Sequence, residues 1–123
     1  MVLVDTSVWV DHLRAKDEAL VRLLEQGQVG IHPMVIGELA CGHLRNREAL
    51  LGLWQCLPQV IEAGHDEVLH YLQAQQLMGK GIGWVDLHLL ASVSLTPNTW
   101  LWTRDKRLAA VAQSVGNHWL VGH

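Results

Sequence analysis

The sequence predicts an α/β fold in which a parallel sheet is covered by helices on both faces. Short, wholly apolar segments of strand length alternate along the chain with longer segments whose apolar residues recur at helical spacing. Wholly apolar strands are typical of parallel sheets buried on both faces, whose strands are joined by right-handed crossovers. The 123 residues show no repeat, linker or low-complexity segment, so we expect a single domain over residues 1–123.

Turn and capping residues divide the first half of the chain into three strands and four helices. An apolar run ends at the polar residues 5–7, which predicts a buried strand followed by a short helix. Asp17 suits the N-cap of the next helix, Gly27 suits its end, and Pro33 suits the first position of a third helix. The expected strands are 2–4, 29–31 and 59–62, and the expected helices are 6–13, 17–27, 33–43 and 48–54.

The second half of the chain continues this alternation. A long amphipathic helix is expected from residue 66 to the glycine-rich segment 79–83, which ends it. The remaining expected elements are a helix over 84–94, a strand over 99–102, a helix over 105–115 and a last strand over 118–121. The sequence therefore predicts five short strands.

Composition limits the classes of protein that this chain can represent. Half of the residues are hydrophobic and 17% are charged, which excludes intrinsic disorder and indicates apolar surface kept for a partner or a second copy. The formal charge of −3 argues against a uniformly basic nucleic-acid-binding face. The start has no basic leader segment and no apolar run is long enough to span a membrane, so we expect a cytoplasmic protein. Cys41 and Cys56 indicate neither a disulfide framework nor a zinc site.

Four acidic residues stand alone among apolar neighbours: Asp5, Glu38, Asp86 and Asp105. Asp5 and Asp105 each follow a predicted strand, and ligands of open α/β sheets bind beyond the carboxyl ends of the strands. Asp86 lies in the first turn of its helix and Glu38 in the middle of its helix, from which both could reach the same crevice. Carboxylates gathered in an apolar setting need a cation. All-oxygen ligation selects Mg²⁺ or Mn²⁺, and such a site favours hydrolysis of a phosphate ester.

Each acid also has a purely structural interpretation. Asp5 and Asp105 can be helix N-caps, and Asp86 can be a first-turn acid that interacts with the helix dipole. Glu38 is harder to explain in this way, because its neighbours one helical turn away carry no charge. The spacing of the acids alone leaves both interpretations open.

The segments around the four acids carry a family resemblance. They are residues 4–9 (VDTSVW), 38–42 (ELACG), 86–91 (DLHLLA) and 103–108 (TRDKRL). In this order they resemble a PIN domain, and more narrowly a VapC-type toxin of bacterial type II toxin–antitoxin systems, over essentially the whole chain. The resemblance implies a three-layer α/β/α sandwich with a five-stranded parallel sheet in the order 3-2-1-4-5.

The resemblance also implies an activity and partners. It implies a Mg²⁺- or Mn²⁺-dependent endoribonuclease whose catalytic and metal-binding residues are Asp5, Glu38, Asp86 and Asp105. Hydroxyl groups would support these acids, namely those of Thr6, Ser7 and Thr103. The substrate would be RNA, and the protein would form a homodimer that a cognate VapB-like antitoxin silences. Leu108 departs from the pattern, because the family often has an aromatic residue there.

Two other classes of function remain open. A phosphotransfer domain, either a receiver or an aspartate-nucleophile phosphatase, would also place an aspartate after the first strand. The phosphatase needs a second acid two residues later, where Ser7 stands, and the receiver needs an aspartate after the third strand, where Glu62 precedes Ala63. A PIN-like module that only binds RNA or protein would not need all four acids.

Basic and aromatic residues offer further contacts with RNA. Eight basic side chains could line a groove for phosphates: Arg14, Lys16, Arg45, Arg47, Lys80, Arg104, Lys106 and Arg107. Trp9 and Trp84 could stack on bases, but each flanks an apolar face, so packing is favoured. His88 is expected at the surface, and the eight histidines form no zinc-binding motif.

Overall fold

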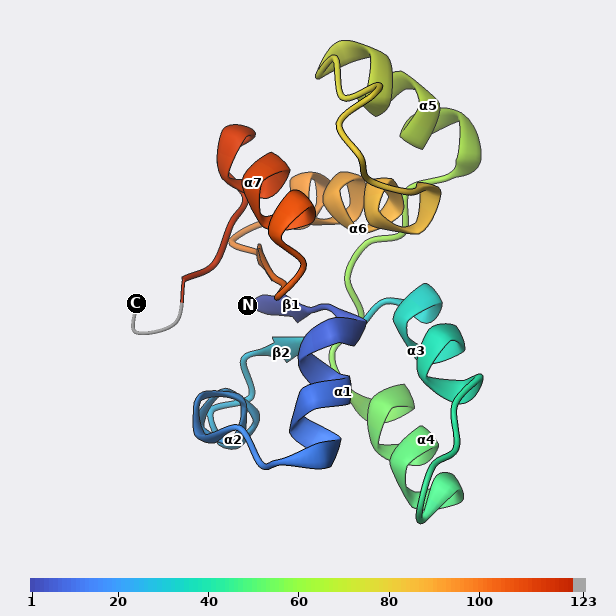
Figure 1. Cartoon of the computed structure of the whole chain (residues 1–123), viewed down its shortest axis with the longest axis vertical. Helices are drawn as coiled ribbons and strands as arrows, with labels where there is room; N and C mark the ends of the chain where they lie inside the picture. The colour runs from blue at the N-terminus through green and yellow to red at the C-terminus, as the bar shows by residue number, and fades with distance from the viewer. Residues whose placement is uncertain (121–123) are drawn as a thin grey trace.

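A parallel sheet of three strands lies at the centre of the computed structural model, which describes residues 1–120 (Figure 1). The strands are β1 (Val2–Val4), β2 (Val29–Gly30) and β3 (Trp100–Trp102), in the order β2-β1-β3. Leu3 in β1 lies opposite Gly30 on one side and Leu101 on the other. All three residues of β1 are buried, because β1 is the central strand. The predicted α/β class with a parallel sheet is confirmed.

The two outer strands of the expected five are reduced to single bridges in the described residues. Gln59 bridges Ile31 next to β2, and His118 bridges Leu101 next to β3, both in parallel orientation. Each bridge consists of two backbone hydrogen bonds made by one residue of the sheet. At Leu101, for example, the N–H donates to the Asn117 carbonyl and the carbonyl accepts the N–H of Trp119. The prediction of five strands is therefore wrong for this part of the chain.

The segment after residue 60 is held by side-chain hydroxyls and not by β2. The Ile61 N–H donates to Thr96 Oγ1 at 2.9 Å, and the Ala63 N–H donates to Ser92 Oγ at 3.4 Å. β2 ends at Gly30 and a helix begins at Pro33, so the ladder stops at the bond from the Val60 N–H to the Ile31 carbonyl. Of the other expected outer strand, 118–121, Val121 lies outside the described residues.

Helices cover both sides of the sheet. They are α1 (Thr6–Arg14), α2 (Glu18–Glu25), α3 (Pro33–Ala40), α4 (Arg47–Cys56), α5 (His65–Ala74), α6 (Trp84–Leu95) and α7 (Lys106–Ser114). Figure 1 shows α1 to α4 on one side of the sheet and α5 to α7 on the other. The carboxyl ends of β1 and β3 lead directly into α1 and α7, which brings the starts of these two helices together.

Capping residues set several helix ends where the sequence predicts them. The Asp17 side chain accepts the N–H of Leu20 at 3.0 Å at the start of α2. Gly27 follows the end of α2 with a φ of 66°, which a residue with a side chain rarely adopts. Pro33 occupies the first turn of α3.

Two helices are shorter than the sequence predicts. α3 ends at Ala40 rather than near residue 43, and α5 ends at Ala74 rather than near residue 78. Gln76 has a φ of 54°, so the chain turns away two residues after α5. Leu44 after α3 and Leu77 after α5 still pack against the core from loops, whereas Met78 is exposed.

α6 is buried on all sides, and the expectation that His88 is a surface residue is wrong. Every residue from Leu87 to Val93 is buried, and His88 is 7% exposed. A helix enclosed by its neighbours has no solvent-facing side, so helical spacing cannot assign one. The His88 ring packs edge-on against the half-buried Trp84, with ring centroids 4.9 Å apart.

Trp9 packs in the core, as predicted. It is 2% exposed and meets Trp54 in an edge-on contact with centroids 5.7 Å apart. Leu108, where the family often has an aromatic residue, is fully buried. Cys41 and Cys56 are free thiols at the surface. None of the described helices has the length and apolar character that a membrane span requires.

Candidate active site

The candidate active site lies at the carboxyl ends of β1 and β3. Asp5 directly follows β1 and precedes α1, and Asp105 is the residue before α7. The Asp5 N–H donates to the Trp102 carbonyl at 2.9 Å, so the two connections leave the sheet side by side. This adjacency places Asp5 and Asp105 at the same edge of the sheet.

Asp5 is the buried acid of the site. It is 6% exposed, and its Oδ2 accepts hydrogen bonds from Ser7 Oγ at 2.7 Å and Thr103 Oγ1 at 2.8 Å. Its side chain makes no capping hydrogen bond to α1, although it occupies the N-cap position. The structural interpretation of Asp5 as a helix cap is therefore wrong.

Glu38 projects from α3 toward the start of α1. Its Oε1 accepts the hydroxyl of Thr6 at 2.6 Å, a contact between residues thirty-two positions apart. Glu38 and Asp105 are exposed and Asp86 is half-buried, so the expectation of four buried acids holds for Asp5 alone. Apolar neighbours in the sequence did not bury these acids, because on a helix those neighbours point to other sides.

Asp86 and Asp105 both cap helices, as their structural interpretation predicts. Asp105 Oδ1 accepts the N–H groups of Arg107 at 2.9 Å and Leu108 at 3.0 Å. Asp86 Oδ2 accepts the N–H of Gly83 at 3.1 Å. Each cap uses a single carboxylate oxygen, so capping leaves the other oxygen of both residues available.

The four carboxylates share one arrangement. In each, hydrogen bonds hold one oxygen, while within residues 1–120 the second oxygen accepts none: Asp5 Oδ1, Glu38 Oε2, Asp86 Oδ1 and Asp105 Oδ2. None of the four forms an ion pair in the described chain, where the salt bridges use other acids. The site therefore presents oriented and uncompensated negative charge.

The acids also influence the protonation of one another. The pKa of Asp86 is raised above its usual value, first by burial and then by the charges of Asp5, Asp105 and Glu38. The hydrogen bond from Gly83 opposes this shift in pKa. Because the three other carboxylates each act on Asp86, all four belong to one electrostatic cluster.

The donor atoms fit a hard divalent cation. The free atoms are carboxylate oxygens, which are the ligands that Mg²⁺ and Mn²⁺ prefer. Within residues 1–120, no three His, Cys, Asp or Glu side chains form a ready-made metal-binding group. An open set of carboxylates suits Mg²⁺ better than a closed cage, because Mg²⁺ usually keeps several waters and uses one or two carboxylates.

Three hydroxyl groups support the acids. Thr6 donates to Glu38, and Ser7 and Thr103 donate to Asp5. Thr103 Oγ1 also accepts the N–H of Asp105 at 3.1 Å, so a single buried hydroxyl links the two acids that follow β1 and β3.

Sequence reasoning missed the role of Arg104. Its guanidinium donates to Asp11 at 2.7 Å and also to Asp17, and its N–H donates to Ser7 Oγ at 3.0 Å. These contacts fasten the connection between β3 and α7 to α1, so Arg104 is engaged by protein carboxylates. No local signal in the sequence marks the pairs, because the partners lie more than eighty positions away.

Comparison with known proteins identifies the class. The PIN domain family matches residues 2–114, and the chain therefore belongs to that family. It is also similar to two curated relatives, both named Ribonuclease VapC32, from Mycobacterium tuberculosis strains CDC 1551 / Oshkosh and ATCC 25618 / H37Rv. Each is 49% identical over 116 residues, which cover 94% of this chain and 94% of the relative. Within the PIN family, the chain is thus of the VapC ribonuclease type.

Proposed function

We propose that this chain is a metal-dependent endoribonuclease, the toxin of a VapBC-like system, in which Asp5, Glu38, Asp86 and Asp105 hold Mg²⁺ or Mn²⁺. The observation that carries the proposal is the cluster of four carboxylates, each with one oxygen anchored and one free, without a cationic partner in the described chain. The choice of RNA is supported by the 49% identity to Ribonuclease VapC32. We take residues 1–123 as one PIN domain.

Electrostatics explains why the acids need the cation. Two carboxylates about 5 Å apart repel by roughly 3 kcal/mol at an effective dielectric constant near 20, and an RNA phosphate entering the cluster would add to this repulsion. A bound divalent cation would neutralise part of this negative charge, activate water and stabilise negative charge on the scissile phosphate. The acids alone would repel the substrate.

Hydroxyl and amide groups of the chain hold the four carboxylates in fixed orientations. Ser7 and Thr103 fix Asp5 Oδ2, which leaves Oδ1 without a hydrogen bond within residues 1–120. Thr6 does the same for Glu38, and backbone amides do so for Asp86 and Asp105. Ligands held in this way lose little freedom when a cation binds, which favours binding and fixes the line of attack on the phosphate.

We propose the partners and location on the same basis. The VapC type implies a VapB-like antitoxin that silences the protein, and we propose a homodimer in the cytoplasm. Exposed large apolar side chains support protein partners, among them Leu53, Ile61 and Met78, which is 56% exposed. A phosphotransfer domain loses its support because the chain belongs to the PIN family. A module that only binds would not need four oriented carboxylates.

The test is cleavage of labelled RNA with Mg²⁺, Mn²⁺ or EDTA. We expect the wild type to cut with either metal and not with EDTA, and Asp5→Asn and Asp105→Asn to lose more than about 100-fold, because even outer-sphere partners of metals contribute 10- to 100-fold. Asparagine caps helices well, so Asp105→Asn should keep α7 intact. Asp66→Asn is the matched control, because Asp66 is an exposed first-turn acid of α5 outside the site. Equal cleavage by all four proteins would refute the proposal.

A further inference from the structure

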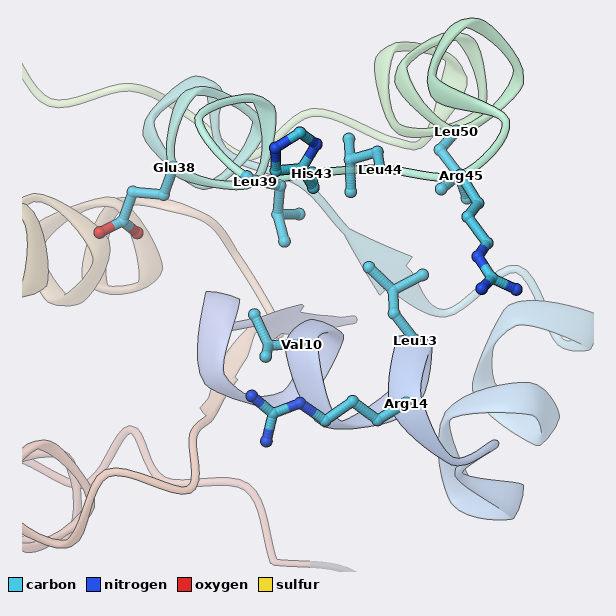
Figure 2. Close-up of a pocket in the computed structure, with 10 residues that line it drawn as sticks. Val10, Leu13, Arg14, Glu38, Leu39, His43, Leu44, Arg45 and Leu50 are labelled. Atoms are coloured by element: carbon cyan, nitrogen blue, oxygen red, sulfur yellow. The ribbon is translucent and has the colours of Figure 1, made fainter.

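A pocket of about 430 Å³ lies beside the acidic cluster, between α1, α3 and α4 (Figure 2). Its apolar lining consists of Val10, Leu13, Leu39, Leu44 and Leu50. Figure 2 shows the α1 side chains facing those of α3 and the following loop across this space. Pockets of a few hundred Å³ are large enough for a small organic group such as a nucleobase.

The pocket is continuous with the candidate active site through Glu38. Glu38 lines the pocket and also belongs to the carboxylate cluster, where it accepts the hydroxyl of Thr6. In Figure 2, Glu38 stands at one end of the pocket and Arg45 at the other. When one phosphate of an RNA strand lies at the acids, a neighbouring nucleotide therefore lies at the pocket.

Two arginines border the pocket with their charges uncommitted. Within residues 1–120, neither Arg14 nor Arg45 takes part in an ion pair or a hydrogen bond through its guanidinium, and both are exposed. Three of the other basic residues that the sequence offered for RNA are engaged by the protein itself, whereas Lys80, Lys106 and Arg107 do not line the pocket. Arg104 pairs with two aspartates, Lys16 pairs with Glu18 at 3.9 Å, and Arg47 donates to a backbone carbonyl at 3.4 Å.

We propose that this pocket binds one nucleotide of single-stranded RNA next to the scissile bond, with Arg14 and Arg45 on phosphates and the aliphatic lining against the base. The proposal rests on the proposed ribonuclease function. Single-stranded RNA presents splayed bases, whose apolar faces gain free energy when they leave water, and a guanidinium group can bind two phosphate oxygens at once. Charge complementarity favours this occupant over a neutral protein segment, because two free arginines against one carboxylate, Glu38, border the pocket on a chain of net charge −3.

The test measures binding of a labelled single-stranded RNA in EDTA, so that cleavage plays no part and the repulsion by the four acids is the same in every variant. Replacing both arginines, as Arg14→Ala with Arg45→Ala, should lower the slope of log K against log salt by about 1.4, since each phosphate contact on a single strand contributes about 0.7. At 0.1 M salt this slope change corresponds to roughly 25-fold weaker binding. Arg14→Lys with Arg45→Lys should keep most of the slope, because it keeps the charge. Arg22→Ala removes an exposed arginine of α2 outside the pocket and should leave binding unchanged.

The apolar lining has its own test. Leu13→Asp places an anion at an exposed leucine of the lining and should weaken RNA binding, whereas Leu53→Asp alters an equally exposed leucine outside the pocket and should not. Wild-type affinity and salt slope in the double alanine variant would overturn the inference and leave the pocket to a protein partner. If the wild-type protein binds the RNA with the expected salt slope but never cuts it in Mg²⁺ or Mn²⁺, the proposed function is refuted and the binding site is supported.

Discussion

The Thr103 hydroxyl should be worth several kcal/mol, because it serves both acids at the strand ends. It donates to Asp5 Oδ2 at 2.8 Å and accepts the Asp105 N–H at 3.1 Å, in a residue that is 6% exposed. Thr103→Val keeps the shape and removes both bonds. A hydrogen bond to a charged group contributes about 1.5–3 kcal/mol and a neutral one about 1, so we expect a loss of about 2.5–4 kcal/mol in the free energy of unfolding.

Urea denaturation followed by tryptophan fluorescence measures this loss as a lower midpoint at unchanged slope. Thr99→Val is the matched control, because Thr99 is also 6% exposed but its hydroxyl donates only to the nearby Pro97 carbonyl at 2.9 Å. We expect the control to lose about 1 kcal/mol. Thr103→Ser keeps a hydroxyl and should recover most of the stability.

Activity gives the second half of this prediction. If Asp5 acts as proposed, loss of one of the two hydroxyls that hold its side chain should lower RNA cleavage by about 10- to 100-fold, as loss of an outer-sphere partner does at metal sites. Equal destabilisation by Thr103→Val and Thr99→Val, with cleavage unchanged in both, would refute the role given to this hydroxyl.

Three further predictions follow from the charges of the molecule. Arg104→Gln should lower the free energy of unfolding by about 1 kcal/mol at low salt and by less in 1 M NaCl, because its ion pairs are partly exposed, whereas Lys16→Gln should change it by less than about 0.5 kcal/mol. Burial lowers the pKa of His32 below its ordinary 6.5, so as the pH falls the His32 ring is protonated at a higher pH in the unfolded state than in the folded state. The urea midpoint should therefore fall as the pH drops below about 6.5. His32→Asn can still cap α3 and should flatten that dependence between pH 7 and 5.5. In EDTA, Asp86→Asn should raise Tm by removing one of four clustered charges. Added Mg²⁺ should raise Tm in the wild type more than in this variant. A larger Mg²⁺-induced rise in Tm in the variant would contradict the proposed ligand set.

The parts of the fold that local patterns control could be predicted from the sequence. The apolar run before Asp5, the cap at Asp17 and the proline at the start of α3 fix elements through interactions a few residues long. The placement of Asp5 and Asp105 at one edge of the sheet could also be predicted, because neighbouring parallel strands end at the same edge. Local capping and strand polarity were therefore sufficient for the centre of the site.

The remaining features depend on contacts that are distant in the sequence. The segment 59–62 has the pattern of a strand, but its partner β2 ends at Gly30, and hydroxyls of Thr96 and Ser92 bind the amides of Ile61 and Ala63. His88 lies on a helix that neighbours enclose on every side, which no spacing within that helix reveals. Arg104 looks like a phosphate contact until Asp11 and Asp17 are brought to it by the fold.

The hydrogen bond between Asp5 and Thr103 joins residues ninety-eight positions apart, and β1 lies between its two partner strands. A chain whose synthesis stops before residue 100 would carry Asp5, Glu38 and Asp86, but neither Asp105 nor the hydroxyl that links it to Asp5. If these acids act as proposed, unfinished products on the ribosome would be harmless to the cell that makes them. The order of elements along the chain would thus delay a toxic activity until β3 and the residues up to Asp105 have been made.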